Sequence, residues 1–333
     1  MIKVSDYLAD RVAGLGVKHV FMITGGGAMH LNDSFGRNKD LEFVCNHHEQ
    51  ACAIAAEGYS RVSGNIGVAV VTTGPGGTNA ITGVLGQWHD SISALYISGQ
   101  VKYETTVAST GLSLRQLGDQ EADIVSLVKP ITKYAVMVTD PKSIRYHFEK
   151  ALYLAKSGRP GPVWIDIPLD VQASLVNEDE LRSYEPEDES ESSFDKERVR
   201  AQAESLVARI KESRRPVILA GSGIRTANAN ESFLKLVDLL KIPVLTAWNA
   251  HDIMYDSHPR YFGKPSTVGD RPGNFIIQNS DLMISIGCRL NVRQIGYEFK
   301  SFAREAFRAI VDIDDTELKK PTIFPDMAVH SDA

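Results

Sequence analysis

The sequence has few cysteines and no long apolar run. Its 333 residues include 3 cysteines. An odd, widely spaced set is typical neither of a disulfide framework nor of a metal cluster. We therefore predict that Cys45, Cys52 and Cys288 are small buried apolar residues in a reducing cytoplasm. No apolar stretch approaches the roughly 18 residues that span a bilayer, so no membrane association is expected.

Basic runs are also missing. Lysine and arginine total 36 against 42 acidic residues, a formal net charge of −6, which argues against a nucleic-acid partner. The first residues, MIKVSDY, have the pattern of an amphipathic helix and not of a signal peptide, which favours a cytoplasmic location. Since no G-x-G-x-x-G fingerprint occurs, an ordinary dinucleotide site is not predicted.

What the chain does have is an alternation of short β-branched runs with helical patterns. The expected strands are residues 19–23, 41–45, 67–72, 94–98 and 163–167, and the expected helices are residues 4–14, 49–63, 79–89 and 143–156. The run GVAVV at 67–71 is apolar on both faces, as a central parallel strand would be. The pattern predicts an α/β fold with a doubly wound parallel sheet.

A second α/β unit follows an acidic stretch. Residues 177–196 are rich in Asp, Glu and Ser and poor in apolar side chains, so they cannot fold alone. We interpret them as a linker between domains at 1–176 and 197–333, with a solvent-exposed helix face as the alternative. In the second domain the expected strands are residues 216–220, 243–246, 281–286 and 309–313, with a further one at Val329, and the expected helices are residues 230–240 and 299–306.

One carboxylate stands where an expected strand meets a helix of small residues. Residues 45–61 read CNHHEQACAIAAEGYSR. This places Glu49 in the first helical turn, where the helix dipole favours negative charge. Taken alone, Glu49 is more simply a helix-capping residue.

Two glycine-rich turns follow other expected strands. Residues 73–79 read TGPGGTN, and residues 24–30 read TGGGAMH. Glycine lets the backbone approach a ligand or a neighbouring segment closely, and Pro75 stiffens the first of these turns. A glycine-rich turn after a strand is, by itself, only a weak indication of a binding site.

Together, residues 45–61 and 73–79 resemble the pyrimidine-binding domain of thiamine diphosphate enzymes, in the acetolactate synthase branch. The resemblance implies that Glu49 is a catalytic group that activates the cofactor. It also implies that the cofactor is bound by Gly25, Gly26, Gly27, Glu49, Thr73, Gly74, Pro75, Gly76 and Asn79.

A third segment carries the same resemblance. Residues 117–125, LGDQEADIV, are similar to the family's F-Q-E-x-x-I-V stretch, which implies that Gln120 is a second catalytic residue. The alternative is a polar loop. Asp119 replaces the family's aromatic residue, which favours a more polar acceptor such as a keto-sugar. His30 and His48 are further candidate substrate contacts, with ordinary surface histidines as the alternative.

The second domain resembles the family's Rossmann-like middle domain, which holds FAD in acetolactate synthases. Residues 287–293 read GCRLNVR where that branch has G-x-R-F-D-D-R, so Arg289 and Arg293 match and both aspartates are missing. Val268 stands where that branch has a histidine. We therefore expect a structural middle domain, with FAD binding as the weaker alternative.

The resemblance also implies a Mg²⁺ ion, because two buried phosphates need cation charge. The family's Gly-Asp-Gly run and asparagine pair have no match in this sequence, so no metal ligand is predicted here. The diphosphate-binding domain of a neighbouring subunit is expected to supply them, in a homodimer or homotetramer. The chain is expected to be inactive alone.

The predicted function is therefore the N-terminal part of a 2-oxo acid carboligase or decarboxylase that uses thiamine diphosphate, with pyruvate as the expected substrate. The abrupt end near Val329 favours a piece of a longer chain. The alternatives are a split-enzyme subunit, or a non-catalytic relative that scaffolds or regulates. The acceptor stays open among pyruvate, 2-oxobutyrate, a keto-sugar and a proton.

Overall fold

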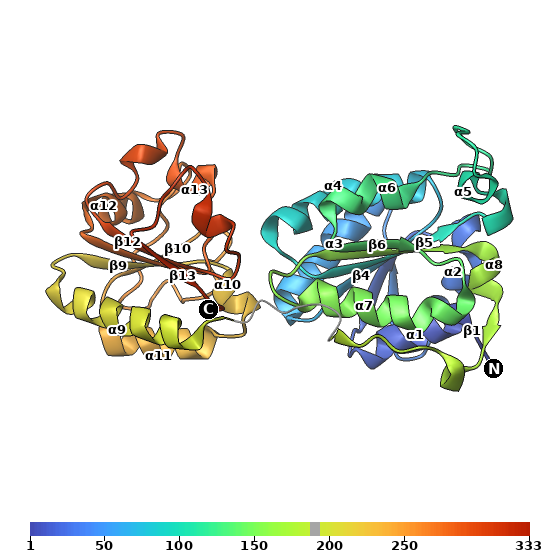
Figure 1. The fold of residues 1–333 in the computed structure, drawn as a ribbon, viewed down its shortest axis with the longest axis horizontal. Coiled ribbons are helices and arrows are strands. Elements are labelled where there is room, and N and C mark those ends of the chain that lie inside the picture. The colour runs from blue at the N-terminus through green and yellow to red at the C-terminus, as the bar shows by residue number, and fades with distance from the viewer. Residues whose placement is uncertain (187–193) are drawn as a thin grey trace. The chain divides into compact units, whose positions relative to one another are not determined.

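Two α/β units make up the chain in the computed structural model (Figure 1), which describes residues 1–186 and 194–333. The units are Met1–Ser190 and Glu191–Ala333. Their boundary falls within the stretch predicted as a linker, of which residues 187–193 lie outside the described residues. Earlier in that stretch, Leu181 and Tyr184 are buried, and Leu181 belongs to the core of the first unit.

The first unit is built on a six-stranded sheet in the order β3-β2-β4-β5-β7-β6. Every neighbouring pair is parallel. The strands are β2 (His19–Met22), β3 (Glu42–Cys45), β4 (Gly67–Val71), β5 (Ala94–Gln100), β6 (Tyr134–Met137) and β7 (Pro162–Pro168). A short antiparallel pair, β1 (Ile2–Lys3) and β8 (Leu175–Val176), forms a separate sheet. The predicted doubly wound parallel sheet is confirmed.

Helices cover both faces of this sheet. One face carries α1 (Val4–Gly14), α2 (Met29–Arg37) and α7 (Ile144–Lys156), and the other carries α3 (Glu49–Ser63), α4 (Pro75–Asp90) and α6 (Ile124–Val128). The short helices α5 (Val107–Thr110) and α8 (Leu169–Ala173) lie after β5 and β7. The faces separate because side chains alternate along a strand: Leu95 and Ile97 pack in one cluster, Tyr96 in the other.

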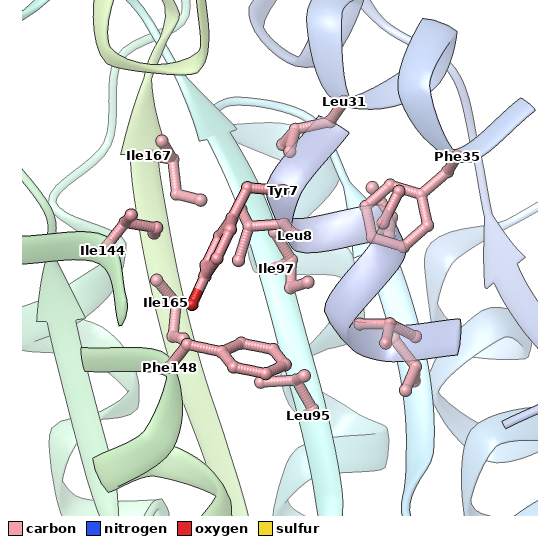
Figure 2. Close-up of a cluster of buried hydrophobic side chains, with 14 of the residues drawn as sticks. Tyr7, Leu8, Leu31, Phe35, Leu95, Ile97, Ile144, Phe148, Ile165 and Ile167 are labelled. Atoms are coloured by element: carbon pink, nitrogen blue, oxygen red, sulfur yellow. The ribbon is translucent and has the colours of Figure 1, made fainter. Parts of the chain in front are cut away.

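Figure 2 shows the larger of these two clusters. Tyr7 of α1, Phe35 of α2 and Phe148 of α7 meet over Ile97 and Ile165 of the central strands, and all five side chains are buried. Full burial of one such side chain stabilises the fold by about 1.5–3 kcal/mol. This packing holds α1, α2 and α7 against the sheet.

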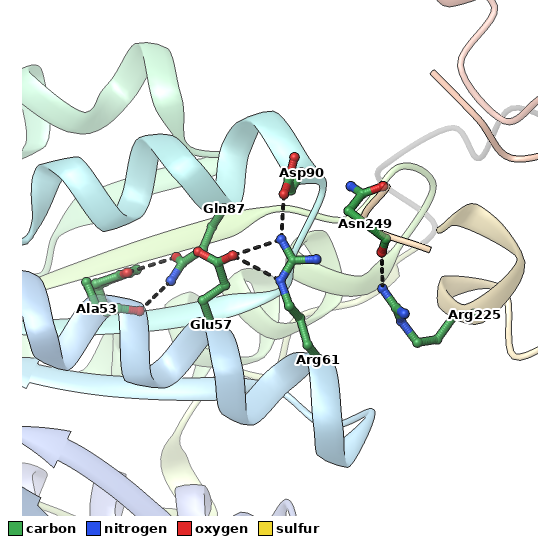
Figure 3. Close-up of polar contacts among 8 residues, drawn as sticks. Ala53, Glu57, Arg61, Gln87, Asp90, Arg225 and Asn249 are labelled. Atoms are coloured by element: carbon green, nitrogen blue, oxygen red, sulfur yellow. Dashed lines mark hydrogen bonds and ion pairs between the residues drawn. The ribbon is translucent and has the colours of Figure 1, made fainter. Parts of the chain in front are cut away.

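On the opposite face, α3 and α4 pack almost backbone to backbone. A Cβ atom on Gly83 of α4 would overlap the Cβ atom of Ala53 on α3. In Figure 3, Gln87 Nε2 donates to the Ala53 carbonyl oxygen at 2.8 Å, and Arg61 pairs with Asp90 at 2.5 Å. These contacts tie the two helices together along their length.

The second unit has a five-stranded parallel sheet in the order β10-β9-β11-β12-β13. Its strands are β9 (Pro216–Ala220), β10 (Val244–Thr246), β11 (Leu282–Ile286), β12 (Phe307–Asp312) and β13 (Met327–His330), and its helices are α9 (Lys196–Glu212), α10 (Gly223–Thr226), α11 (Asn230–Leu240), α12 (Arg271–Asn279) and α13 (Val292–Ile295). The strand expected at Val329 is confirmed as β13.

Three expectations about elements and burial fail. The helix expected at 79–89 begins earlier, at Pro75, because a proline in the first turn of a helix loses no hydrogen bond. At 299–306 only the turn Phe299–Ser301 is helical, since Ala303 has a φ of +44°. Cys45 is exposed, because β3 is an edge strand of the described sheet.

The other two cysteines are buried, as predicted. Burial raises the pKa of the Cys52 and Cys288 thiols to about 11, so both behave as small apolar residues. Among the helices in residues 1–186 and 194–333, none has the length and apolar character needed to cross a bilayer.

The α3–α4 contact generates a prediction about stability. Gly83→Ala adds a methyl group where Ala53 already lies, so the free energy of unfolding should fall by about 1–3 kcal/mol. Urea denaturation followed by circular dichroism measures the change. The matched control is Gly86→Ala on the same helix, whose added Cβ would lie 3.5 Å from Glu57 in ordinary contact. Equal stability of the two variants would contradict the prediction.

Candidate functional site

The candidate site lies at one edge of the first sheet, where the carboxyl ends of its parallel strands meet. The turn after β2 packs directly on the turn after β4. A Cβ atom on Gly25 would come within 2.5 Å of Thr72 Cγ2, and one on Gly27 would overlap Thr73 Oγ1. Glycine is therefore required at both positions, and the first two predicted glycine turns lie side by side.

The end of β5 joins the same cluster. Thr73 Oγ1 donates to the Gly99 carbonyl oxygen at 3.1 Å, and a Cβ on Gly99 would overlap the Gly27 carbonyl. Gln172 of α8 donates to that Gly27 carbonyl oxygen at 2.7 Å. Side-chain and backbone contacts thus fix the ends of three strands relative to one another.

Glu49 lies in the first turn of α3 and is only 8% exposed. Its Oε2 atom accepts a hydrogen bond from Asn79 Nδ2 at 2.9 Å. The helix cap is His48, whose Nδ1 accepts from the Gln50 backbone N–H at 3.1 Å. The capping role proposed as the simple alternative for Glu49 therefore belongs to His48.

Gly76 keeps the carboxylate of Glu49 uncovered. A Cβ on Gly76 would lie 3.6 Å from Glu49 Oε1, so a larger side chain there would cover this oxygen. Asn79 is one helical turn further along α4 and approaches the other carboxylate oxygen. The start of α4 therefore orients Glu49 through Asn79 and places a glycine beside its other oxygen.

Gln120 reaches this edge through its backbone. Gly74 has a φ of +55°, and a Cβ added to it would overlap the Gln120 carbonyl oxygen. Gln120 itself has a φ of +56° and is exposed. Its neighbour Glu121 accepts hydrogen bonds from the backbone N–H groups of Val107, Leu117 and Gly118, at 2.6, 3.0 and 3.1 Å. One carboxylate thus organises the loop that carries Gln120.

The remaining predicted residues are less tightly connected. Pro75 is exposed at the start of α4, and no heavy atom of the described residues lies within 4 Å of a Cβ built on Gly26. His30 is half-buried near the start of α2, and Asp119 is exposed. In the described part of the chain, no hydrogen bond or ion pair joins His30 or Asp119 to Glu49.

The sequence reasoning missed a buried polar network behind this edge. Asp166 on β7 is completely buried and accepts from Ser98 Oγ at 2.5 Å and from Gln100 Nε2 at 3.2 Å. Trp164 Nε1 donates to Ser98 Oγ at 2.7 Å. Burial raises the pKa of Asp166 to about 7, against the lowering effect of these hydrogen bonds. An acid inside an apolar strand was the available signal.

The second unit has its own glycine turns, but they contact each other. A Cβ on Gly221 or Gly223 would overlap or crowd the backbone of Gly287, which has a φ of +56°. The Arg289 carbonyl oxygen accepts from Lys320, and the Arg293 guanidinium lies 5.6 Å from the centre of the Trp248 ring. These glycines have a packing role in the described residues.

Two protein-family models match this chain and identify its family. Residues 2–127 match the thiamine pyrophosphate enzyme N-terminal TPP binding domain, and residues 203–333 match the central domain of the same enzymes. Thiamine pyrophosphate is thiamine diphosphate. The chain belongs to the thiamine diphosphate enzyme family. The predicted resemblance is confirmed, and thiamine diphosphate is supported as the cofactor of this family member.

The similar curated proteins are acetolactate synthases. The probable acetolactate synthase large subunit of Methanococcus aeolicus is 36% identical over 328 residues, covering 95% of this chain and 51% of that protein. The acetolactate synthase large subunit of Lactococcus lactis is 34% identical over 330 residues, covering 98% and 55%. The chain thus spans about half the length of these relatives and is an acetolactate synthase-like member of the family.

The site fits the pyrimidine end of this cofactor. Glu49 offers a mostly buried carboxylate, and its Oε1 atom lies beside Gly76. At the same edge, Asn32 Oδ1, Asn46 Oδ1 and Thr72 Oγ1 are buried without a hydrogen-bond partner among the described residues, and such atoms usually find one. No cluster of three or more His, Cys, Asp or Glu residues in the described ranges has a metal-binding arrangement.

Asp166 makes the stability of the first unit depend on pH. Its pKa is raised in the fold, so its contribution to stability is complete below the unfolded pKa near 4 and is lost as pH rises through about 7. Asp166→Asn does not ionise. The unfolding free energy of this variant, relative to the unsubstituted protein, should therefore rise between pH 5 and pH 8 in urea denaturation. A pH-independent difference would contradict this.

Proposed function

We propose that this protein is the cofactor-activating part of a thiamine diphosphate-dependent carboligase or decarboxylase acting on a 2-oxo acid, with pyruvate as the donor. The observation that carries the proposal is the buried carboxylate of Glu49, held by Asn79 and left uncovered by Gly76. The acetolactate synthase names of its relatives support pyruvate.

Glu49 would act on a ring nitrogen of the pyrimidine. Thiamine diphosphate, when bound, would supply the carbon nucleophile needed for chemistry at a 2-oxo group. Glu49 Oε1 would hold a proton between itself and ring atom N1′, which favours the imino form of the ring. Asn79 keeps Oε2 in place, so the carboxylate presents one defined oxygen to the ring. Burial beside the glycine turns would keep bulk water from competing for that proton.

Gln120 would orient the substrate. It lies against Gly74, beside the turn proposed to meet the pyrimidine. Asp119, its exposed neighbour, gives this position a negative charge where the resembled family has an aromatic side chain. A polar acceptor, such as a keto-sugar, fits that charge better than a second pyruvate does. His30 and His48 remain candidates for contacts to the substrate.

The diphosphate and its Mg²⁺ would be held by a domain of a neighbouring subunit, in a cytoplasmic homo-oligomer. The exposed side of α3 supports such a partner. Ile54 and Val62 are 52% and 91% exposed, and Ala51 and Gly58 on the same side are also exposed. This stripe of small and apolar residues lies on the helix that begins at Glu49, on the side opposite the buried Glu49, Cys52, Ala53 and Ala56, so a subunit packed there would cover the exposed face of the helix that carries the carboxylate.

Glu49→Gln tests the catalytic part of the proposal. In the complete polypeptide with thiamine diphosphate and Mg²⁺, the variant should lower kcat for pyruvate consumption by about 100-fold or more, because the proton is no longer held at N1′. Glu57→Gln is the matched control, since Glu57 lies on the same helix and pairs with Arg61 instead. Near-normal turnover by the Glu49 variant would remove Glu49 from the mechanism.

Product analysis tests the acceptor. With pyruvate as the sole substrate, the complete enzyme should form 2-acetolactate slowly, and a keto-sugar acceptor should increase pyruvate consumption. Asp119→Phe should shift the preference toward pyruvate. Efficient formation of 2-acetolactate from pyruvate alone would contradict the polar acceptor. If thiamine diphosphate with Mg²⁺ neither stabilises the protein nor supports turnover, the scaffold alternative would be favoured instead.

A further inference from the structure

We propose that Asp166 is a positioning residue, which acts through Gln100 to hold the loop that carries Gln120 against the Gly74 turn. The inference deepens the proposed function and rests on it for the role of Gln120. The physical link itself depends only on contacts within the first unit.

The network begins with strand register. β5 and β7 are parallel neighbours in which Ser98 pairs with Asp166 and Gln100 with Pro168. Side chains two residues apart on a strand share a face, so Ser98 and Gln100 lie on the face that also carries Trp164 and Asp166. This face is covered by α3, α4 and α6. Asp166 is therefore buried below the carboxyl edge of the sheet, where the candidate site lies.

Burying an acidic side chain between two strands carries a large desolvation cost. Asp166 has no ion-pair partner among the described residues, and its hydrogen bonds come from the neutral groups of Ser98 and Gln100. Apolar side chains of similar size would give these strands equal or greater stability. Stability alone therefore does not explain why an acid occupies this position. The way in which Asp166 arranges its hydrogen-bond partners does explain it.

Asp166 fixes the orientation of the Gln100 amide. When ionised, Asp166 only accepts hydrogen bonds, so it selects the orientation in which Gln100 Nε2 points toward it. In that orientation Gln100 Oε1 accepts from the Val101 backbone N–H at 3.0 Å. The second hydrogen of Nε2 is then available to the Ala122 carbonyl oxygen, 3.1 Å away. Reversing the amide would place an acceptor against both oxygens.

Ala122 connects this amide to the site. It follows Gln120 and Glu121 directly, and its carbonyl oxygen also accepts from the Ile124 backbone N–H. Without Gln100 that local turn would persist, but this bond between the loop and the sheet would be gone. Glu121 closes the loop on itself through Val107, Leu117 and Gly118, whereas Gln100 ties it to β5. The position of Gln120 against Gly74 therefore depends on the Gln100 bond.

Hydrogen exchange of the complete polypeptide, without cofactor, tests the link. Asp166→Leu and Gln100→Met should each accelerate exchange across residues 107–122 by about three- to tenfold, the range for losing one hydrogen bond. Tryptic cleavage after Arg115, which is exposed in this loop, should accelerate in parallel. Two variants are used so that misfolding of one leaves the other informative.

Two controls separate positioning from stability. Ser98→Ala removes the other donor to Asp166 and lowers thermal stability, yet it leaves all three Gln100 side-chain hydrogen bonds in place. Asp166→Asn retains an oxygen that accepts from Gln100 and should rescue loop protection. Neither control should change exchange of residues 107–122 by more than about twofold, well below the loss of a hydrogen bond. Equal exchange in Gln100→Met and Ser98→Ala at matched thermal stability would overturn the proposal.

Turnover then connects the loop to the reaction. In the complete enzyme with pyruvate, thiamine diphosphate and Mg²⁺, Gln100→Met should raise KM more than it lowers kcat, because Gln120 is displaced while Glu49 is untouched. Unchanged KM and kcat despite faster loop exchange would overturn the catalytic half of the inference. An inactive unsubstituted protein would refute the proposed function alone, because the exchange result needs no cofactor.

Discussion

Backbone contact among glycine turns at the carboxyl edge of the first sheet is the constraint on which the site depends. The turns after β2 and β4 and the end of β5 approach so closely that Gly25, Gly27 and Gly99 have no room for a side chain. Because these turns fill one another's space, each strand end is fixed by its neighbours and not by its own loop. Glu49 and Gln120 enter this edge from a helix and a loop, and each meets a further glycine, Gly76 or Gly74.

Glu49 and Asp166, the two buried acids among the described residues of the first unit, differ in what surrounds their oxygens. Both oxygens of Asp166 are occupied by donors from β5, and the side chain is completely buried. Glu49 has one oxygen bonded to Asn79 and the other beside Gly76. A carboxylate whose two oxygens are both bonded within the protein can only orient its partners, whereas one with an oxygen left beside a glycine can also meet a ligand. This contrast, more than burial alone, singles out Glu49.

Local patterns made much of this predictable. Helix α3 follows from its run of small residues, and most strands follow from short β-branched runs bounded by turns. The predictions that failed depended on contacts distant in the sequence. Cys45 is exposed because β3 is an edge strand of the described sheet. The order of strands in a sheet cannot be predicted from any single segment. The bond from Asn79 to Glu49 was missed because PGGT reads as a turn, although Pro75 begins a helix. The Ser98–Asp166 pairing joins strands far apart in the sequence.

The second unit shows why fold and function have to be argued separately. It repeats the parallel sheet and the glycine turns, and Gly221 and Gly223 press on Gly287 much as the turns of the first unit do. In the described residues, those glycines contact one another closely. Close packing of glycine turns therefore stabilises strand ends in both units. It forms a candidate site in the first unit, where a helix adds a carboxylate. The chemistry proposed for this chain rests on a few side chains placed on this scaffold.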